Sequence, residues 1–289
     1  MAVSNTIKTY YWLTKPGIVY GNCISAAAGF LFASHRNIDA GLLIETVVGI
    51  AFVIASACVT NNYLDKDIDQ KMARTKERAL VRGTVSDRSA MVYAAILTFG
   101  GFFILARYTN RLTIIAGLIG LYAYVLAYGW GKRHTVWGTL IGSIPGAMPL
   151  VAGYLAVTHK IDKTAVLLFL LMAVWQLPHF YSIAIYRLKD YKGAGLPVWP
   201  AKKGIPSTKR QILFLIAVFM ILTACLGFFH YAGKVYFVVT VALAGLWLNK
   251  GMRGWDSKNN ERWARGMFGY SLIVLMVWSG MLAANAWLP

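Results

Sequence analysis

A stretch at residues 61–82 reads NNYLDKDIDQKMARTKERALVR and directly follows a long apolar segment. Asn61, Asp65 and Asp69 recur every fourth residue, so a helix continuing out of that segment would carry all three on one face. Asp67 points away from this row. Carboxylate oxygens at this spacing suit Mg²⁺, which usually binds through one or two carboxylates together with substrate phosphates. We therefore expect a metal site at the end of this helix.

A cluster of cations follows the acidic row. Arginine forks bind phosphate oxygens in pairs, and lysine adds a compact positive charge. Row and cluster together predict a site for a metal-bound polyphosphate. An ordinary solvated loop at a membrane edge would also carry cations, but it gives no reason for three evenly spaced Asn and Asp side chains. The cations are Lys71, Arg74, Lys76, Arg78 and Arg82.

The composition is that of an integral membrane protein. The chain has 289 residues, of which 58% are hydrophobic. Short connections join its apolar runs, so we expect an all-α fold with a single membrane-embedded domain covering residues 1–289. The N-terminal stretch has no apolar core and no small-residue cleavage site, so we expect no removable signal peptide. Nine runs are long enough to span a bilayer, at residues 17–34, 41–63, 89–106, 112–131, 136–157, 164–187, 210–230, 234–250 and 267–287.

Basic residues are divided unevenly between the two sets of connections. Of 29 lysines and arginines, 23 lie on the side of the N-terminus and 6 on the opposite side. This bias predicts a cytoplasmic N-terminus and, with nine spans, a C-terminus outside. A net charge of +18 would suggest nucleic acid in a soluble protein, but here topology explains it and we expect no nucleic-acid partner. Three lone cysteines fall in apolar runs and are interpreted as small apolar side chains; they are Cys23, Cys58 and Cys225.

A second long loop follows the sixth span and lies on the same side of the membrane as the first. It reads YRLKDYKGAGLPVWPAKKG, at residues 186–204. Its start repeats a short pattern of the first loop four spans earlier, which suggests a parallel internal duplication. We expect active-site loops at about residues 64–88 and 188–209. The repeated patterns are Tyr63-x-x-Lys66-Asp67 and Tyr186-x-x-Lys189-Asp190.

Polar side chains at membrane depth are costly and are therefore candidates for function. The sixth span carries Gln176 and His179 in the segment WQLPHF, with a proline between them that kinks the helix. His179 serves either an interhelical hydrogen bond or a substrate contact. Asn22 in the first span is more simply structural. Small residues every fourth position at 138–149, in GTLIGSIPGAMP, indicate close helix packing.

The row of Asn61, Asp65 and Asp69, with a second Asp-bearing loop four spans later, resembles the UbiA superfamily of intramembrane prenyltransferases. Within that superfamily, five motifs in order resemble the protohaem IX farnesyltransferase family, also called haem O synthases. The resemblance extends from Lys8 to about Phe268. The motifs are TKPG at 14–17, NNYLDKDIDQKMARTKERALV at 61–81, KRHTVWGTLIGSIPGAMP at 132–149, WQLPHF at 175–180 and KDYKGAGLPVWP at 189–200.

The resemblance implies nine transmembrane helices around a central cavity, in a bacterial cytoplasmic (inner) membrane. It implies Mg²⁺-dependent transfer of a farnesyl group from farnesyl diphosphate to a vinyl group of protohaem IX, with water addition, giving haem O and diphosphate. Its implied partners are the lipid bilayer and haem A synthase or terminal-oxidase assembly factors. The alternatives are a prenyltransferase acting on an aromatic ring in quinone synthesis and a transporter of an anionic metabolite, although a transporter gives the acidic row no role.

The resemblance also assigns residues. It implies that Asn61, Asp65 and Asp69 bind the metal, with Asp190 from the second loop. Many relatives have an acidic residue where this chain has Tyr186, which leaves one carboxylate fewer for a second Mg²⁺. We expect the leaving diphosphate to be neutralised by Lys71, Arg74 and Arg78.

Further side chains are expected to contact the substrates. Haem propionates need cations at the cytoplasmic edge, and His179 is the histidine best placed to ligate iron. Aromatic faces can stabilise an allylic cation. The expected substrate contacts are Asn61, Asn62, Lys132, Arg133, Gln176, His179, Tyr186 and Lys189, and the aromatic candidates are Tyr63, Phe180, Tyr181, Tyr186 and Tyr191.

Overall fold

The computed structural model describes residues 2–289, with side chains from residue 6 onward. The described chain is helical, and nine of its helices are long and apolar enough to cross a membrane. The predicted all-α class and nine spans are therefore confirmed. The spans are α2 (Pro16–Ser34), α3 (Ala40–Leu64), α5 (Asp87–Tyr108), the continuous run α6 (Arg111–Tyr122), η1 (Ala123–Tyr128) and α7 (Gly129–His134), α8 (Gly138–Thr158), α9 (Lys163–Tyr186), α12 (Ile205–Phe228), α13 (Lys234–Arg253) and α14 (Asn260–Ala284).

Two spans begin earlier than the hydropathy pattern predicts. Helix α12 starts at Ile205 rather than at 210, and α14 starts at Asn260 rather than at 267. The added residues at the start of both helices include lysine or arginine, so an apolar run does not include them. Their backbones continue the helix all the same, because helical hydrogen bonding does not depend on side-chain polarity.

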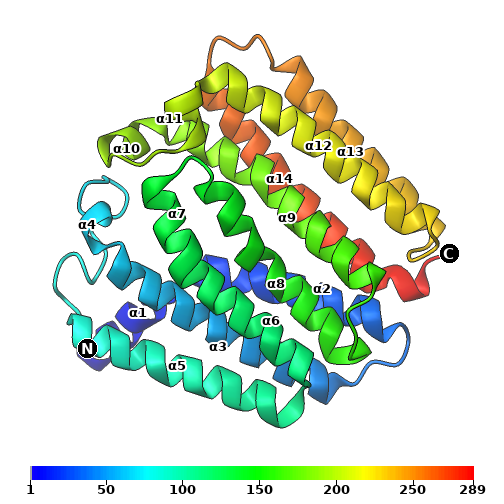
Figure 1. Ribbon diagram of the computed structural model, residues 1–289, viewed down its shortest axis with the longest axis horizontal. Coiled ribbons are helices and arrows are strands. Elements are labelled where there is room, and N and C mark those ends of the chain that lie inside the picture. The colour runs from blue at the N-terminus through cyan, green and yellow to red at the C-terminus, as the bar shows by residue number, and fades with distance from the viewer. Residues whose placement is uncertain (1) are drawn as a thin grey trace.

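Short helices gather at one end of the bundle. Figure 1 shows α4, α10 and α11 beside the end of α7, at the left and upper left of the view. These segments come from the two long loops that the sequence singled out. The short helices at this end are α1 (Ala2–Leu13), α4 (Lys66–Asp69), α10 (Leu188–Gly193) and α11 (Trp199–Lys203), whereas η2 (Asn285–Trp287) lies at the opposite end.

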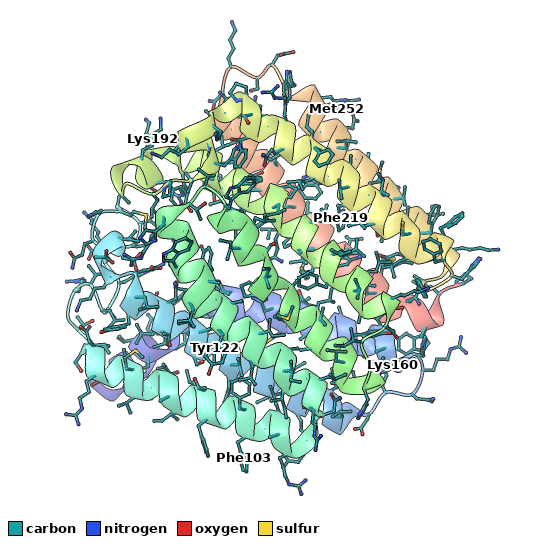
Figure 2. All side chains as sticks on the ribbon, in the orientation of Figure 1. Phe103, Tyr122, Lys160, Lys192, Phe219 and Met252 are labelled. Carbon is teal, nitrogen blue, oxygen red and sulfur yellow. The ribbon has the colours of Figure 1, made fainter. Side chains whose placement is uncertain are left out.

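The opposite end collects the connections that carry few cations. Arg36 Nε, in the α2–α3 connection, donates a hydrogen bond to the Ala286 carbonyl oxygen near the C-terminus at 3.0 Å. The Gly233 amide, between α12 and α13, donates to Asn285 Oδ1 at 2.8 Å. Figure 2 shows Lys160 and Lys192 at opposite ends of the helices. The two sets of connections are therefore separated as an alternation of nine spans requires.

Helices α2 and α8 meet backbone to backbone in the centre of the bundle. A Cβ atom on Gly29 would lie 2.0 Å from the Leu150 carbonyl oxygen, and one on Gly153 would lie 1.9 Å from the Ala26 carbonyl oxygen. No side chain fits at either position, so these glycines set the distance between the two helices.

The glycines at the other half of α8 have a second role. A Cβ on Gly142 would come within 2.8 Å of the Tyr128 ring, and one on Gly146 within 1.8 Å of Gln176 Oε1. The packing interpretation of this segment is therefore incomplete, because these two glycines make room for side chains that line a cavity.

Candidate active site

The acidic row crosses a break between two helices. Helix α3 ends at Leu64, and Asp65 has φ −94° and ψ 4° before α4 begins. The continuous helix on which the shared face depended is interrupted at this point. Backbone hydrogen bonds between residues four positions apart nevertheless continue through the break. Asp65 N donates to Asn61 O at 2.9 Å, and Asp69 N donates to Asp65 O at 2.8 Å. The row therefore keeps its helical spacing.

Each member of the row is paired with a cation, in two cases from another part of the chain. Lys132 Nζ donates to Asp65 Oδ2, and Arg78 Nη1 donates to Asp69 Oδ2 at 2.5 Å. Lys15 Nζ donates to Asn61 Oδ1 at 2.8 Å. Asn61, Asp65 and Asp69 are all buried, and the exposed fractions of the whole residues are 3, 9 and 2%. A buried row of this kind would be unfavourable without such partners.

Lys15 is a site residue that the sequence reasoning missed. It precedes Pro16 at the start of α2 and adopts a left-handed backbone with φ 54°. Burial lowers the pKa of Lys15 to about 8. The signal in the sequence is a lysine directly before a proline at the start of the first span, within the TKPG motif.

Asn62 contacts the N-terminal segment. Its Nδ2 donates to the Leu13 carbonyl oxygen at 2.8 Å and thereby ties the end of α1 to α3. This contact places Asn62, which we expected to bind substrate, in a structural position beside the row.

Arg133 also lies at the end of α3. Its guanidinium donates to both carboxylate oxygens of Asp67, at 2.8 and 2.9 Å, and to the Leu64 carbonyl oxygen. The hydrogen bonds from Arg133 lower the pKa of Asp67. Asp67 thus turns away from the row, as its spacing predicted. Lys132 and Arg133, expected near haem propionates, lie against the first loop in this structure.

The two long loops contact each other. Ile68 and Met72 of the first loop form a small buried cluster with Ala194 of the second, flanked by Tyr191 and Leu196. Apolar contacts therefore hold α10 close to α4, as expected if both loops serve one site.

Some charged residues of the second loop interact with each other. Asp190 lies 3.8 Å from Arg187, measured between Oδ2 and Nη1. Two guanidinium groups contact the Tyr186 ring, with Arg187 Cζ 5.3 Å and Arg265 Cζ 5.0 Å from the ring centroid. Tyr186 thus takes part in cation–π contacts with two arginines.

Four of the predicted cations remain available to a ligand. They are exposed, and none of them forms an ion pair with a described side chain; they are Lys71, Arg74, Lys76 and Lys189. They stand on the two loops that meet at α4 and α10. The site therefore contains half-buried cations paired with the row and exposed, unpaired cations on the two loops.

An apolar cavity of about 440 Å³ opens between the helices next to the row. Lys132, Gln176 and His179 supply polar groups to its lining. Gln176 Nε2 is itself held by the Met172 and Ser143 carbonyl oxygens, at 3.0 and 3.3 Å. An apolar pocket with a few convergent polar groups is the usual form of a ligand site.

The aromatic wall of the cavity differs from the one predicted. Of the five aromatic candidates, Phe180 and Tyr191 line the cavity. Two further tyrosines, Tyr124 and Tyr128, line it as well, with ring centroids 5.5 Å apart. Lys132 Nζ lies 5.1 Å from the centroid of Tyr128. The signal in the sequence was their spacing of four residues, Tyr124–Tyr128–Lys132.

A π-helical turn places these tyrosines. The segment η1 (Ala123–Tyr128) interrupts the α-helical fourth span, and such turns occur frequently at functional sites. The turn changes the helical phase between the apolar first half of the span and the segment that carries Lys132.

The donor set fits a Mg²⁺ ion only together with a phosphate ligand. Within residues 2–289, no three His, Cys, Asp or Glu side chains lie close enough to hold a metal by themselves. The row offers two carboxylates and one amide oxygen, all hard donors. Asp65 Oδ1 is buried and accepts no hydrogen bond from a described group, and Arg133 Nη2 lies 3.5 Å from it. Mg²⁺ commonly binds through one or two carboxylates plus substrate phosphates, so these residues suit it.

The UbiA prenyltransferase family model matches residues 22–280, and the chain belongs to that family. The family predicted from the motifs is therefore confirmed, and the transporter alternative is excluded. Solved structures of this fold agree. A digeranylgeranylglyceryl phosphate synthase structure has a TM-score of 0.80 at 20% identity, covering 98% of this chain and 99% of that one. A UbiA homologue from Archaeoglobus fulgidus bound to GPP and Mg²⁺ has a TM-score of 0.71 at 18% identity, covering 96% and 99%.

More similar relatives carry a more specific name. The protoheme IX farnesyltransferase of Protochlamydia amoebophila is 45% identical over 94% of this chain and 96% of its own length. The protoheme IX farnesyltransferase of Shigella sonnei is 45% identical over 98% of this chain and 96% of its own length. These relatives favour the porphyrin branch of the family over the quinone branch.

Proposed function

We propose that this enzyme transfers a farnesyl group from farnesyl diphosphate to a vinyl group of protohaem IX and, after water addition, releases haem O and diphosphate. The observation that carries the proposal is the position of the Asp65–Asp69 row, which meets Lys132 at the edge of an apolar cavity. This arrangement joins a site for a charged diphosphate to a site for a prenyl chain. The choice of acceptor rests on the relatives named protoheme IX farnesyltransferase.

The row would hold Mg²⁺ through Asn61 Oδ1 and the carboxylates of Asp65 and Asp69. When bound, the ion supplies Lewis-acid neutralisation of the diphosphate. Asp190 stands on the loop that packs against α4 and is the remaining carboxylate of the proposed set.

The cations on the row act on the leaving group. Lys132, Arg78 and Lys15 neutralise the row in this structure, and phosphate oxygens compete for the same donors. Lys71 and Arg74 on the exposed loop add further donors. Such groups lower the barrier when they point at oxygens whose negative charge grows in the transition state.

The cavity directs the carbon chemistry. The C1–O bond of farnesyl diphosphate breaks, and its electron pair leaves with the diphosphate. The terminal carbon of the vinyl group attacks the allylic cation at C1, which forms the new C–C bond and moves the positive charge to the carbon beside the porphyrin. Water adds there and loses a proton to give the hydroxyl group. Tyr124 and Tyr128 present aromatic faces to the cavity that holds the allylic cation.

The orientation in the membrane follows from charge. We place the N-terminus and both active-site loops in the cytoplasm of a bacterium and the chain in its inner membrane, because 23 of the 29 cations belong to that end. Haem A synthase or oxidase assembly factors are the proposed recipients of the product.

The test is an assay of the detergent-purified protein with haem, farnesyl diphosphate and Mg²⁺, followed by chromatography and mass measurement. We expect haem O, its loss on chelation of Mg²⁺, and its return when Mg²⁺ is restored. Protein that prenylates 4-hydroxybenzoate or a naphthoate and leaves haem unchanged would contradict the proposal.

A further inference from the structure

His179 occupies a distinct place in the cavity. It lies on α9, seven residues before the helix ends at Tyr186, which corresponds to a depth of about 10 Å at 1.5 Å per residue. Among the residues that line the cavity, it is the only imidazole. Lys132 lines the same cavity, so the row end and His179 belong to one continuous space.

A hydrogen-bond chain assigns the proton on the His179 ring. Ser271 Oγ on α14 donates to the Phe268 carbonyl oxygen at 2.6 Å, which uses its single hydroxyl hydrogen. The 2.7 Å contact between His179 Nδ1 and Ser271 Oγ therefore requires Nδ1–H as the donor. In the neutral ring the other nitrogen, Nε2, then carries the lone pair.

Packing fixes the orientation of the ring. His179 stacks on Trp175 with centroids 5.1 Å apart and lies 4.9 Å from the Phe268 ring centroid. Nε2 has no hydrogen-bond partner among the side chains and backbone groups that the structure describes. Histidines that bind metals commonly donate their second N–H to an oxygen in this way, which fixes the ring and its tautomer.

The other histidines lack this arrangement. His134 is exposed, its Nδ1 contacts the Trp130 carbonyl oxygen at 2.9 Å, and it does not line the cavity. His35, His159 and His230 sit in connections at the opposite end of the bundle. Sulfur ligands in the cavity lining are limited to Cys58, Met148 and Met172.

We propose that His179 Nε2 is an axial ligand to the iron of the acceptor porphyrin, with Ser271 as the residue that positions its ring. This inference rests on the proposed function, since it needs haem as the acceptor. Ligation at one fixed nitrogen would hold the macrocycle against α9 and limit where its vinyl groups lie relative to the diphosphate end. Positioning of reactants in this way contributes to the rate.

The test measures haem bound to the purified full-length protein. Ferrous wild-type protein is expected to show an iron–histidine stretch in resonance Raman spectra. His179→Ala and His179→Gln are expected to lose that band, to shift the Soret absorption and to weaken haem binding at least tenfold. Added imidazole should restore the absorption of His179→Ala by filling the vacated position.

Two further variants separate ligation from structure. Ser271→Ala removes the acceptor of the Nδ1–H bond, so it should keep the iron–histidine band but shift its frequency. His134→Ala is the matched control and should leave the band and the Soret absorption unchanged. A purely structural Ser271 would move neither the band nor the haem affinity.

The outcomes distinguish this inference from the proposed function. A wild-type spectrum without an iron–histidine band, or an unchanged spectrum in both His179 variants, would overturn the ligand assignment while haem O formation continued. Bands typical of thiolate or thioether ligation would instead point to Cys58 or a methionine and would also overturn it. Wild-type protein that forms no haem O would contradict the proposed function itself.

Discussion

Lys132 donates a hydrogen bond to Asp65 Oδ2 across 67 positions of sequence, joining the end of the fourth span to the end of the second. Both side chains have an exposed fraction of only 13%. Each charge would be costly in this environment without the other. The pair therefore fixes where α7 meets the acidic row and holds a cation at the edge of the cavity, available to a diphosphate.

Replacing Lys132 should impair turnover through the diphosphate. We expect Lys132→Gln to lower kcat/KM for farnesyl diphosphate about 100-fold, corresponding to about 2.7 kcal/mol of lost transition-state stabilisation. Lys66→Gln is the matched control, because Lys66 does not contact the row and pairs instead with Asp87, with 2.9 Å between Nζ and Oδ1. This substitution should change kcat/KM less than twofold. Equal effects of the two substitutions in steady-state assays would refute the role of Lys132.

The same pair predicts coupled stability. Lys132→Gln leaves the buried Asp65 carboxylate with only the more distant Arg133, 3.5 Å from its Oδ1, so the Tm of this variant should fall. Adding Asp65→Asn removes the carboxylate charge that has lost its nearest partner, and the double variant should be more stable than Lys132→Gln alone. Thermal unfolding in detergent measures the difference. Strict additivity of the two Tm changes would show that the pair is not coupled.

The carboxylates of the row should be individually essential. Asp65→Asn and Asp69→Asn should each reduce haem O formation by at least about 100-fold, because each removes a charged Mg²⁺ donor, an effect of about 3 kcal/mol. Both proteins should purify as folded monodisperse material. Asp87→Asn removes a carboxylate of the same loop outside the row and should retain activity. Near-normal turnover by either row variant would remove it from the metal site.

Gly146 should be required for the position of Gln176. A Cβ at residue 146 would come within 1.8 Å of Gln176 Oε1, so Gly146→Ala should lower Tm and displace that amide. Combining Gly146→Ala with Gln176→Ala removes the conflict and should recover part of the loss. Gly280→Ala is the control, since nothing lies within 4 Å of its Cβ position. A Gly146→Ala Tm equal to that of Gly280→Ala would contradict the packing.

The topology should be readable by labelling. In a protein without its native cysteines, Thr84→Cys in the first loop should react only from the cytoplasmic side. Asn37→Cys in the α2–α3 connection should react only from outside. Both positions are exposed, and the charge bias sets their sides. Labelling of both from one side would refute the nine-span orientation.

The sequence by itself determined the class of fold and the acidic row. Apolar runs of membrane length follow from the bilayer thickness, so spans such as Pro16–Ser34 were predictable to within a few residues. A four-residue spacing also predicts neighbouring positions where the helix is locally irregular. The Asn61–Asp65–Asp69 row keeps its backbone hydrogen bonds although the helix breaks at Asp65, because one helical turn is a local property.

The tertiary structure alone decided which distant groups meet that row. Lys15 and Lys132 approach it from two other segments, 46 and 67 positions from their partners, and no sequence spacing encodes contacts between segments so far apart. The aromatic lining was mispredicted for a related reason. Which face of a span turns inward depends on helix packing and on the π-helical turn before Tyr128, because a span that is apolar all round carries almost no signal of its buried side.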